Sequence, residues 1–309
     1  MPFKKKKKCN FALMSVNVKK WFYLITLSII WGSSYILIKK GLLGLTPLQL
    51  GSIRIFFTAL ILLLVGFKSL KKIPKKAWRW IIMTGYFGTF FPSYLFAISE
   101  TVINSSVVAV LNGMTPLFTL ILGITYFKID FRRNQAVGIM IGFFGTVILV
   151  SNEFSLGSAS DGSYALLIVI AAMCYAINVN LLKYKLPGVP AMAIALGNFV
   201  AILPAALILF LYSGFSFTRA LEDPVVQESL VYIFILAFLG TALAKVMFND
   251  LVAISSPVFS ISITYLLPIV AIGWGLLDNE TFTWVQWMAC AFILFGVYLV
   301  TENKKSASK

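Results

Sequence analysis

The sequence is poor in the residue types on which most enzyme and metal sites depend. It has no histidine. Its three cysteines, Cys9, Cys174 and Cys290, fall in an N-terminal tail and two apolar runs, without the spacing of metal ligands or of a disulfide framework. The GxxxxGK[ST], HExxH and GxSxG motifs are also missing, and no apolar run contains a pair of aspartates. Nucleophilic triads, metalloprotease centres and ATP-driven transport within this chain therefore lack their parts, and we expect no enzyme activity, no cofactor and no metal.

Charged residues are scarce and apolar residues are abundant. Of 309 residues, 12% are charged and 60% are hydrophobic, with a mean hydropathy of +0.91, whereas a typical soluble domain has about 25% charged and about 45–50% apolar residues. Because lipid leaves no exposed backbone group unpaired and the apolar runs lack the alternation of barrel strands, they must be helices. The sequence predicts an all-α membrane protein with ten transmembrane helices of about 20 residues, at 21–39, 48–67, 78–99, 105–127, 136–151, 164–183, 191–213, 230–251, 257–277 and 283–301.

Acidic residues are especially few, with 11 against 26 lysines and arginines. The cations are concentrated in the N-terminal tail and in alternate loops, so the basic balance indicates orientation rather than a nucleic-acid partner. If the N-terminus is cytoplasmic, only Lys39, Lys40 and Arg219 lie in outer segments, and the positive-inside rule places both termini in the cytoplasm. We expect a multi-pass protein of the cell (inner) membrane, in contact with the lipid bilayer, with a basic cytoplasmic tail at 1–20 and a second tail at 302–309.

An internal repeat organises the chain. GYFGTFFPSYLF (85–96) and AFLGTALAKVMF (237–248) align without gaps, and the same offset pairs Pro116 with Pro268. Because each copy holds five spans, an odd number, the second copy must cross the membrane in the opposite sense. This predicts two inverted repeats around a central cavity, an architecture suited to alternating access. The two predicted repeats cover 21–151 and 164–301.

Several motifs, taken in order, resemble one known family. They are WGSSYILIKKG (31–41), LGSIRIFFTALILL (50–63), the TP and LP pairs at 115–116 and 267–268, and the closing strings GTVILV and GVYLV. Together they resemble the EamA family of the drug/metabolite transporter superfamily. The resemblance implies a basket of ten helices whose first, third, fourth, sixth, eighth and ninth members line a cavity, and a role in exporting amino acids or related metabolites. EamA repeats often carry a glutamate at the end of the fourth helix, which Glu280 supplies in the second repeat while Lys128 occupies the matching place in the first.

Two cations, Arg54 and Lys245, lie within predicted spans. A charge at mid-helix costs about 2.5–3.5 kcal/mol on insertion scales, so it usually finds water, a partner or a function. The repeat places Gly197 opposite Arg54 and Ser93 opposite Lys245, so the shared scaffold demands neither cation. Both could snorkel to the membrane surface. If they face a cavity instead, they favour a substrate with a carboxylate or another anionic group.

Uncharged polar and aromatic residues recur at helical spacing in several of the spans. Trp31, Ser34 and Tyr35, for example, share one face of the first span, and Tyr86, Ser93 and Tyr94 share one face of the third. Such groups can join neighbouring helices, but as a set they are better explained by a hydrated, aromatic-lined cavity. The candidate substrate-binding residues are Trp31, Ser34, Tyr35, Arg54, Tyr86, Tyr94, Asn112, Tyr175, Asn178, Lys245, Asn249 and Tyr265.

Pro116 and Pro268 are candidate hinges because each interrupts its helix at the same place in the two repeats. A proline removes one backbone hydrogen bond and permits a bend, which alternating access requires. A static kink explains the same residues equally well.

These observations favour a secondary transporter that exports or facilitates the passage of amino acids or related small metabolites. The alternative within transport is multidrug or cation efflux, but the first span, 21–39, holds no acid of the kind that small cation exporters use there. A second class is a membrane scaffold or sensor without transport. The partner is a small-molecule solute, and the oligomeric state stays open, with a monomer as one option.

The acidic residues lie at span ends or in loops. Proton-driven transport usually requires a buried Asp, Glu or His, so the sequence predicts uniport or exchange with little dependence on a proton gradient. Glu100, Asp250 and Lys245 are the places where a missed coupling residue would be sought.

Overall fold

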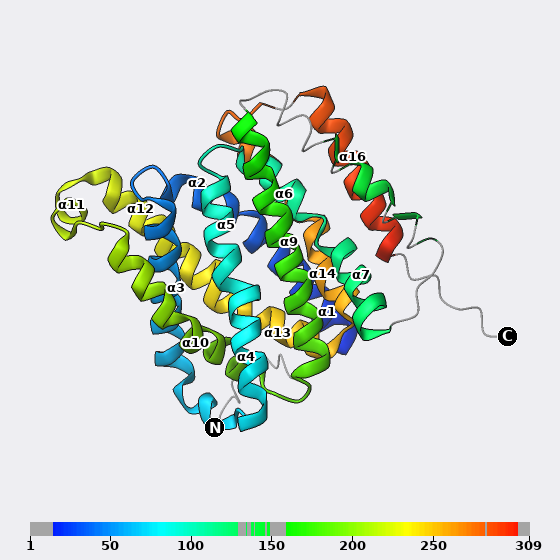
Figure 1. Ribbon diagram of the computed structural model, residues 1–309, viewed down its shortest axis with the longest axis horizontal. Helices are drawn as coiled ribbons and strands as arrows, with labels where there is room; N and C mark the ends of the chain where they lie inside the picture. Colours follow the sequence, from blue (N-terminus) through cyan, green and yellow to red (C-terminus); the bar gives the residue numbers. More distant parts are fainter. Residues whose placement is uncertain are drawn as a thin grey trace, which may run out of the picture.

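The computed structural model describes residues 15–128, 134, 137–138, 140–145, 147–148, 159–281 and 283–301. They form a helical bundle (Figure 1), in which eight helices are long and apolar enough to cross a membrane. These eight correspond to the first four predicted spans and to the sixth through ninth. The prediction of an all-helical membrane protein is confirmed for the described part of the chain.

The helices follow one another in the same order in both repeats. In the first repeat they are α1 (Val16–Gly32), α2 (Ser34–Gly41), α3 (Pro47–Gly66), the 3₁₀ helices η2 (Phe67–Lys72) and η3 (Lys75–Ala77), α4 (Trp78–Gly85), the π-helix η4 (Tyr86–Phe90), α5 (Phe91–Ser99), α6 (Ser105–Asn112) and α7 (Thr115–Phe127). In the second they are α9 (Ala159–Lys185), α10 (Ala191–Tyr212), α11 (Phe217–Glu222), α12 (Pro224–Ile235), the π-helix η5 (Leu236–Leu243), α13 (Ala244–Ile254), α14 (Pro257–Ile261), the 3₁₀ helix η6 (Ser262–Tyr265), α15 (Leu267–Leu277) and α16 (Trp284–Thr301).

Local capping explains where two of these helices start. α1 begins at Val16, earlier than the predicted residue 21, because the Ser15 hydroxyl accepts a hydrogen bond from the Val18 N–H at 3.4 Å. α3 begins with a capping box, in which the side chains of Thr46 and Gln49 each accept a hydrogen bond from the backbone N–H of the other residue. Both starts leave the apolar part of the span intact.

The fifth predicted span is described only in part, and the tenth contains a shorter apolar helix than the eight spans described above. The fifth, 136–151, falls largely outside the described residues, as do 1–14 and 302–309. The tenth is α16, whose described apolar stretch, Trp284–Gly296, is shorter than the eight spanning helices. In Figure 1, α16 lies at the edge of the bundle, where it packs on α6 and α7. The total of ten spans therefore stays a prediction.

Several spans are broken near mid-length, and the breaks recur in the two repeats. The aligned segments 85–96 and 237–248 both contain a π-helix, η4 and η5. Pro116 and Pro268 both stand in the first turn of a new helix, α7 and α15, where a missing N–H costs nothing. The helix breaks at the two prolines are thus observed, and their bending during transport stays a prediction.

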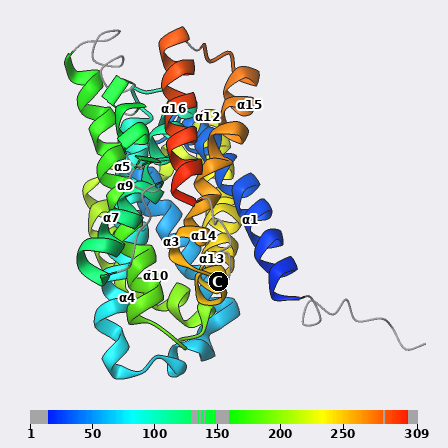
Figure 2. The same cartoon turned by 90° about the vertical axis from the view of Figure 1, so that its right-hand side faces the viewer.

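The two repeats interlock. α3 packs on α10 and α5 packs on α9, so helices of the first repeat contact helices of the second. The equivalent contact also occurs with the repeats exchanged. α13 of the second repeat packs on α1 of the first, just as α5 of the first repeat packs on α9 of the second. Seen from the side, most helices lie roughly along one common axis (Figure 2). Any space at the centre of the bundle is consequently lined by both repeats.

Ion pairs join the repeats at the two ends of the first span. At the end of α2, Lys39 contacts Asp278 at 2.7 Å and Glu280 at 2.9 Å. We call these three residues the Lys39 cluster. At the start of α1, Lys19 contacts Asp250 at 2.7 Å. Polar contacts between the repeats therefore lie at opposite ends of the bundle, with the centre between them.

Candidate functional site: a central cavity with two cations

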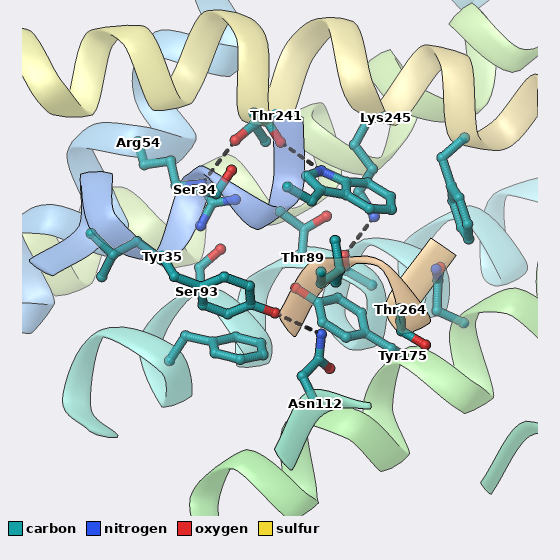
Figure 3. A pocket seen from close by; sticks show the side chains of 18 of the residues that line it. Ser34, Tyr35, Arg54, Thr89, Ser93, Asn112, Tyr175, Thr241, Lys245 and Thr264 are labelled. Carbon is teal, nitrogen blue, oxygen red and sulfur yellow. Dashed lines mark hydrogen bonds between the residues drawn. The ribbon is translucent and has the colours of Figure 1, made fainter. Parts of the chain in front are cut away.

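A cavity lies between the repeats, near the breaks in the spans (Figure 3). Residues of α1, α2, α3, η4, α5, α6, α9, η5 and α13 to α15 line it. Its volume is about 80 Å³, roughly half of the ~150 Å³ that accepts a benzene-sized molecule. This conformation has room for a small solute, and a larger one requires the helices to move apart.

Arg54 of α3 borders the cavity beside the π-helix of the second repeat. Its Nε donates a hydrogen bond to Thr241 Oγ1 at 2.8 Å, and the Thr241 hydroxyl donates to Leu236 O at 3.0 Å. Leu236 lies five residues before Thr241, so the π-turn sets the direction in which this hydroxyl points. Among the described residues no carboxylate forms an ion pair with Arg54. Its guanidinium group therefore retains donors for a ligand.

Lys245 of α13 also borders the cavity, with 7% of its surface exposed. Its Nζ donates a hydrogen bond to the carbonyl oxygen of Gly88 in η4. That carbonyl is available because Pro92, four residues further on, has no N–H with which to close a helical turn. The contact joins the two repeats and holds Lys245 inside the protein, so the snorkelling alternative is wrong for this residue.

The two π-helices present equivalent carbonyl groups to the cavity. Gly88 and Gly240 occupy the same place in the repeat alignment, and both line the cavity. Gly88 O accepts from Lys245, and Gly240 O accepts from Trp31 Nε1 at 2.9 Å. π-turns are frequent at functional sites because they free backbone groups from the regular helical pattern. Each repeat thus presents a π-helix carbonyl to a side chain of the cavity wall.

Aromatic side chains form another part of the wall. Tyr35 Oη accepts a hydrogen bond from Asn112 Nδ2 at 2.9 Å. Tyr175 stacks on Phe96 with the ring centroids 5.9 Å apart, and Phe96 also meets the Tyr35 ring edge-on. Contacts among these cavity-lining side chains thus hold the phenol rings in place.

Two acceptor atoms beside the cavity have no partner. Thr89 Oγ1 and Asn178 Oδ1 are buried, and neither has a hydrogen-bond partner among the described residues. The approach between η4 and α9 is close, since a Cβ atom at Gly88 would lie 2.4 Å from Asn178 Oδ1. A buried polar atom left unpaired costs about 1–3 kcal/mol. A donor group on a solute would remove that cost.

The comparison with known families agrees with this architecture. A family model of EamA-like transporters matches residues 19–151 and 162–302, one match for each repeat. The chain belongs to the EamA-like transporter family. It is accordingly a multi-pass membrane transporter, which is a different class of protein from an enzyme.

Relatives of this EamA transporter support the same conclusion. The uncharacterised inner membrane transporter YedA of Escherichia coli (strain K12) is 30% identical over 91% of this chain and 90% of its own length. A probable amino-acid metabolite efflux pump of Salmonella typhimurium (strain LT2) is 23% identical over 91% of this chain and 94% of its own. One crystal structure, at 14% identity, superposes with a TM-score of 0.64 over 92% of this chain and 96% of that chain. At this identity the superposition indicates the fold alone.

Eight of the twelve candidate residues of the EamA transporter come together around the cavity. They are Trp31, Ser34, Tyr35, Arg54, Asn112, Tyr175, Asn178 and Lys245. Figure 3 shows several of them approaching one space from different helices. Whether they bind a solute stays a prediction.

Three of the other four candidates, Tyr86, Tyr94 and Asn249, do not line it. Tyr86 packs against aromatic rings of η4 and α5, and Tyr94 forms a 2.9 Å hydrogen bond with Ser52 Oγ. Asn249 lies one turn beyond Lys245 and donates to the backbone at the start of α10 at 3.3 Å. The side chain of Tyr265 lies outside the described residues.

Ser93 lines the cavity, whereas Tyr86 and Tyr94, which the sequence groups with it on one face of the third span, do not. The prediction used α-helical spacing for Tyr86, Ser93 and Tyr94. Each π-turn contains one residue more than an α-turn, so η4 rotates α4 relative to α5. Ser93 consequently lines the cavity while Tyr86 lies elsewhere.

The sequence analysis did not single out several cavity residues. Gly88 and Thr89 line the cavity, as do their counterparts Gly240 and Thr241. The signal for them was present, because the repeat alignment contains the same Gly-Thr pair in both copies. Phe96 was missed for another reason, since phenylalanine is common throughout this chain and carries no signal of its own.

Glu280 is buried at one end of the bundle and surrounded by donors. It is 6% exposed, and it accepts hydrogen bonds from the backbone N–H and hydroxyl groups of Ser105 and Ser106 and from Lys39. Ser105 begins α6, so the carboxylate also faces the positive end of a helix. Burial alone would raise its pKa, but the hydrogen bonds from Ser106, Ser105 and Lys39 lower the pKa below its ordinary value of 4.5. Glu280 therefore stays ionised.

Glu100 is buried to the same degree but lacks donors. It is 7% exposed, and neither carboxylate oxygen has a hydrogen-bond partner among the described residues. Burial raises its pKa well above 4.5, and the nearby Glu280 raises it further, while Arg54 and Lys39 lower it. The sequence correctly placed Glu100 and Glu280 at span ends, but it did not indicate that both are buried.

Proposed function

We propose that this EamA transporter is a secondary transporter that exports, or facilitates the passage of, amino acids or related small metabolites across the cytoplasmic membrane. In this proposal the two five-helix repeats are inverted relative to each other, and the cavity opens alternately to the two sides. The repeats' exchanged packing, the paired π-helices and the paired proline breaks support a two-fold relation of this kind.

The observation that carries the proposal is the presence of two cavity cations without acidic partners. Arg54 and Lys245 both border the cavity, and no ion pair to either is found in the described part of the chain. Retaining unpaired cations at membrane depth is costly unless a ligand or water compensates them. A carboxylate would do so through charge-assisted hydrogen bonds, the stronger class of such contacts.

The unpaired acceptors point to the other end of an amino acid. Thr89 Oγ1 and Asn178 Oδ1 would accept from an ammonium group of a solute whose carboxylate lies at Arg54 and Lys245. Donors for one end and acceptors for the other favour a zwitterion over a simple anion. The name of the Salmonella relative, a probable amino-acid metabolite efflux pump, points the same way.

The cavity also argues against the alternative of multidrug or cation efflux. A cationic solute would meet Arg54 and Lys245 as like charges, and the carboxylates that could offset them are at the bundle ends. A scaffold or sensor without transport would need neither a cavity nor cations within it.

Lys245→Met provides the test. Purified protein is first screened by thermal shift against amino acids, organic acids and nucleosides, and the solute found is then used in binding and vesicle-uptake assays. Removing one charge-assisted hydrogen bond, worth about 1.5–3 kcal/mol, should weaken binding roughly 10- to 100-fold while the protein stays folded. Lys68→Met, at an exposed position on η2, is the matched control and should bind normally. Unchanged transport by Lys245→Met would contradict the proposed role.

The orientation can be determined in the same vesicles. We propose that both termini and the loop containing Lys71 face the cytoplasm, on the basis of the charge distribution. A cysteine introduced at position 71 should then react with an impermeant thiol reagent in inside-out vesicles only. Labelling from outside intact cells would contradict this orientation.

A further inference from the structure

Glu100 lies between the cavity and the Lys39 cluster. It directly follows α5, and its N–H donates to the carbonyl oxygen of Phe96 at 2.9 Å. Phe96 lines the cavity, and four residues of helix rise about 6 Å. The charges that act on Glu100 come from both neighbourhoods, namely Arg54 at the cavity and Lys39 and Glu280 in the cluster.

Titratable groups of several neighbouring segments act on Glu100, including the Tyr35 phenol of α2. α3 supplies Arg54, α2 supplies Lys39, and the segment after α15 supplies Glu280. α9 supplies Tyr164, whose carbonyl oxygen accepts a hydrogen bond from the Ser99 hydroxyl at 2.8 Å. α9 also carries Asp161, whose side chain lies outside the described residues. Two cations and one ionised carboxylate thus act on Glu100 from the described elements.

Three features of this position disfavour the ionised form of Glu100. The side chain is buried, it has no hydrogen-bond donor among the described residues, and it stands at the C-terminal, negative end of α5. Against them act the positive charges of Arg54 and Lys39. Arg54 also borders the cavity, so a ligand bound to Arg54 changes the balance between the ionised and the neutral form of Glu100.

We propose that Glu100 is a proton-binding site linked to the cavity, so that one proton binds with each carboxylate solute and is carried with it. A solute carboxylate at Arg54 cancels the positive charge that favours ionised Glu100, and it adds a negative charge of its own. Solute binding therefore draws a proton from water onto a carboxyl oxygen of Glu100, and solute release returns that proton to water. The proposal rests on the proposed function, because it requires a carboxylate in the cavity. It replaces the expectation of proton-independent transport that the sequence alone suggested.

The first test needs no solute. Infrared difference spectroscopy across a pH titration detects neutral carboxyl groups in the purified full-length protein. The wild type should show a carboxyl group that titrates well above pH 4.5, and Glu100→Gln should lose this signal. Glu280→Gln, which changes an equally buried glutamate, should keep the signal with a lower midpoint, because the negative charge of Glu280 raises the pKa of Glu100; the spectra are recorded at a temperature at which this less stable variant is still folded. A Glu100 that titrates near pH 4.5, like an exposed glutamate, would overturn the proposal.

The second test measures the linkage, with L-alanine as the carboxylate probe and L-alaninamide as the matched probe without a carboxylate. Two like charges ~10 Å apart at an effective dielectric constant of ~20 interact strongly enough to change an affinity on the order of tenfold. L-Alanine should therefore bind about tenfold more weakly above the Glu100 midpoint than below it, with proton uptake on binding. L-Alaninamide, which carries only the ammonium charge, should not bind more weakly above that midpoint.

Variants separate the linkage from a structural effect. Glu100→Gln should bind L-alanine without this pH dependence, whereas Glu100→Asp, which retains a carboxyl group, should keep it with a displaced midpoint. The same pH dependence in Glu100→Gln would overturn the linkage. If the wild type fails to bind L-alanine at every pH, the proposed function is contradicted for this solute and the linkage with it. The infrared titration still decides whether Glu100 holds the proton.

Discussion

Glu100 and Glu280 have the same side chain and nearly the same burial, 7% and 6% exposed, at the ends of two helical spans. Glu280 lies beside the first turn of α6, where backbone N–H groups point outward and two serine hydroxyls add further donors. Glu100 lies at the last turn of α5, where the free backbone groups are carbonyls. The comparison teaches that burial alone does not determine the charge of a carboxyl group. The charge depends on which end of a helix the carboxyl group faces and on the hydrogen-bond donors found there.

The largest expected effect is the loss of stability in Glu280→Gln. The glutamine cannot replace a carboxylate that accepts hydrogen bonds from four groups of Ser105 and Ser106 and pairs with Lys39. A buried donor that is left without an acceptor costs about 1–3 kcal/mol, and several of these donors would be affected. Thermal unfolding in detergent, followed by tryptophan fluorescence, should show a marked decrease in Tm. Glu100→Gln is the control and should be at least as stable as the wild type at neutral pH, so equal losses in the two variants would contradict the comparison.

The second-largest expected effect is that the contributions of Glu100 and Glu280 to stability depend on pH in opposite directions. The pKa of Glu100 is raised above its unfolded value of 4.5, so above pH 4.5 the folded state holds a proton that the unfolded state has lost. Its contribution to stability is therefore complete below pH 4.5 and decreases as the pH rises towards the folded pKa, by at most about 1.4 kcal/mol per pH unit. The pKa of Glu280 is lowered, so its contribution is present above pH 4.5 and is lost as the pH falls through the folded pKa.

Denaturation measured from acid to alkaline pH distinguishes these contributions. Glu100→Gln should remove part of the stability loss on the alkaline side of pH 4.5, and Glu280→Gln should remove part of the loss on the acid side. Identical pH profiles for the two variants would show that the two carboxyl groups have similar surroundings after all.

The smallest effect is expected for Lys39→Gln. The Lys39 side chain is 32% exposed, so water and salt screen its contacts with Asp278 and Glu280. Glu280 keeps its serine donors and Asp278 keeps Lys40. The variant should lose less than about 1 kcal/mol, and the difference from wild type should shrink at high salt. A loss as large as that of Glu280→Gln would mean that Lys39, rather than α6, keeps Glu280 ionised.

The structure brings some of the candidate residues together around the cavity and leaves others outside it. Arg54 and Lys245 were found because a cation in an apolar run is conspicuous, and both border the cavity. Tyr86 was grouped with Ser93 by α-helical spacing, which the π-helix η4 changes. Tyr94 follows Ser93 directly in α5 and forms its hydrogen bond with Ser52 instead of lining the cavity. The Gly88 carbonyl could have been anticipated from Pro92, but its contact with Lys245 joins two distant segments and needed the structure.

By itself the sequence determined the helical class, the spans that the structure describes, the repeat and the family. Hydropathy, charge distribution and internal similarity are properties of the chain in order, and the membrane converts them directly into helices because lipid tolerates no unpaired backbone. Only the tertiary structure decided which side chains share the cavity, and which of two glutamates at span ends is given hydrogen-bond donors. Those outcomes depend on contacts between helices far apart in the chain, such as Ser105 and Ser106 with Glu280. The absence of such a contact at Glu100 could not be detected from the sequence around it.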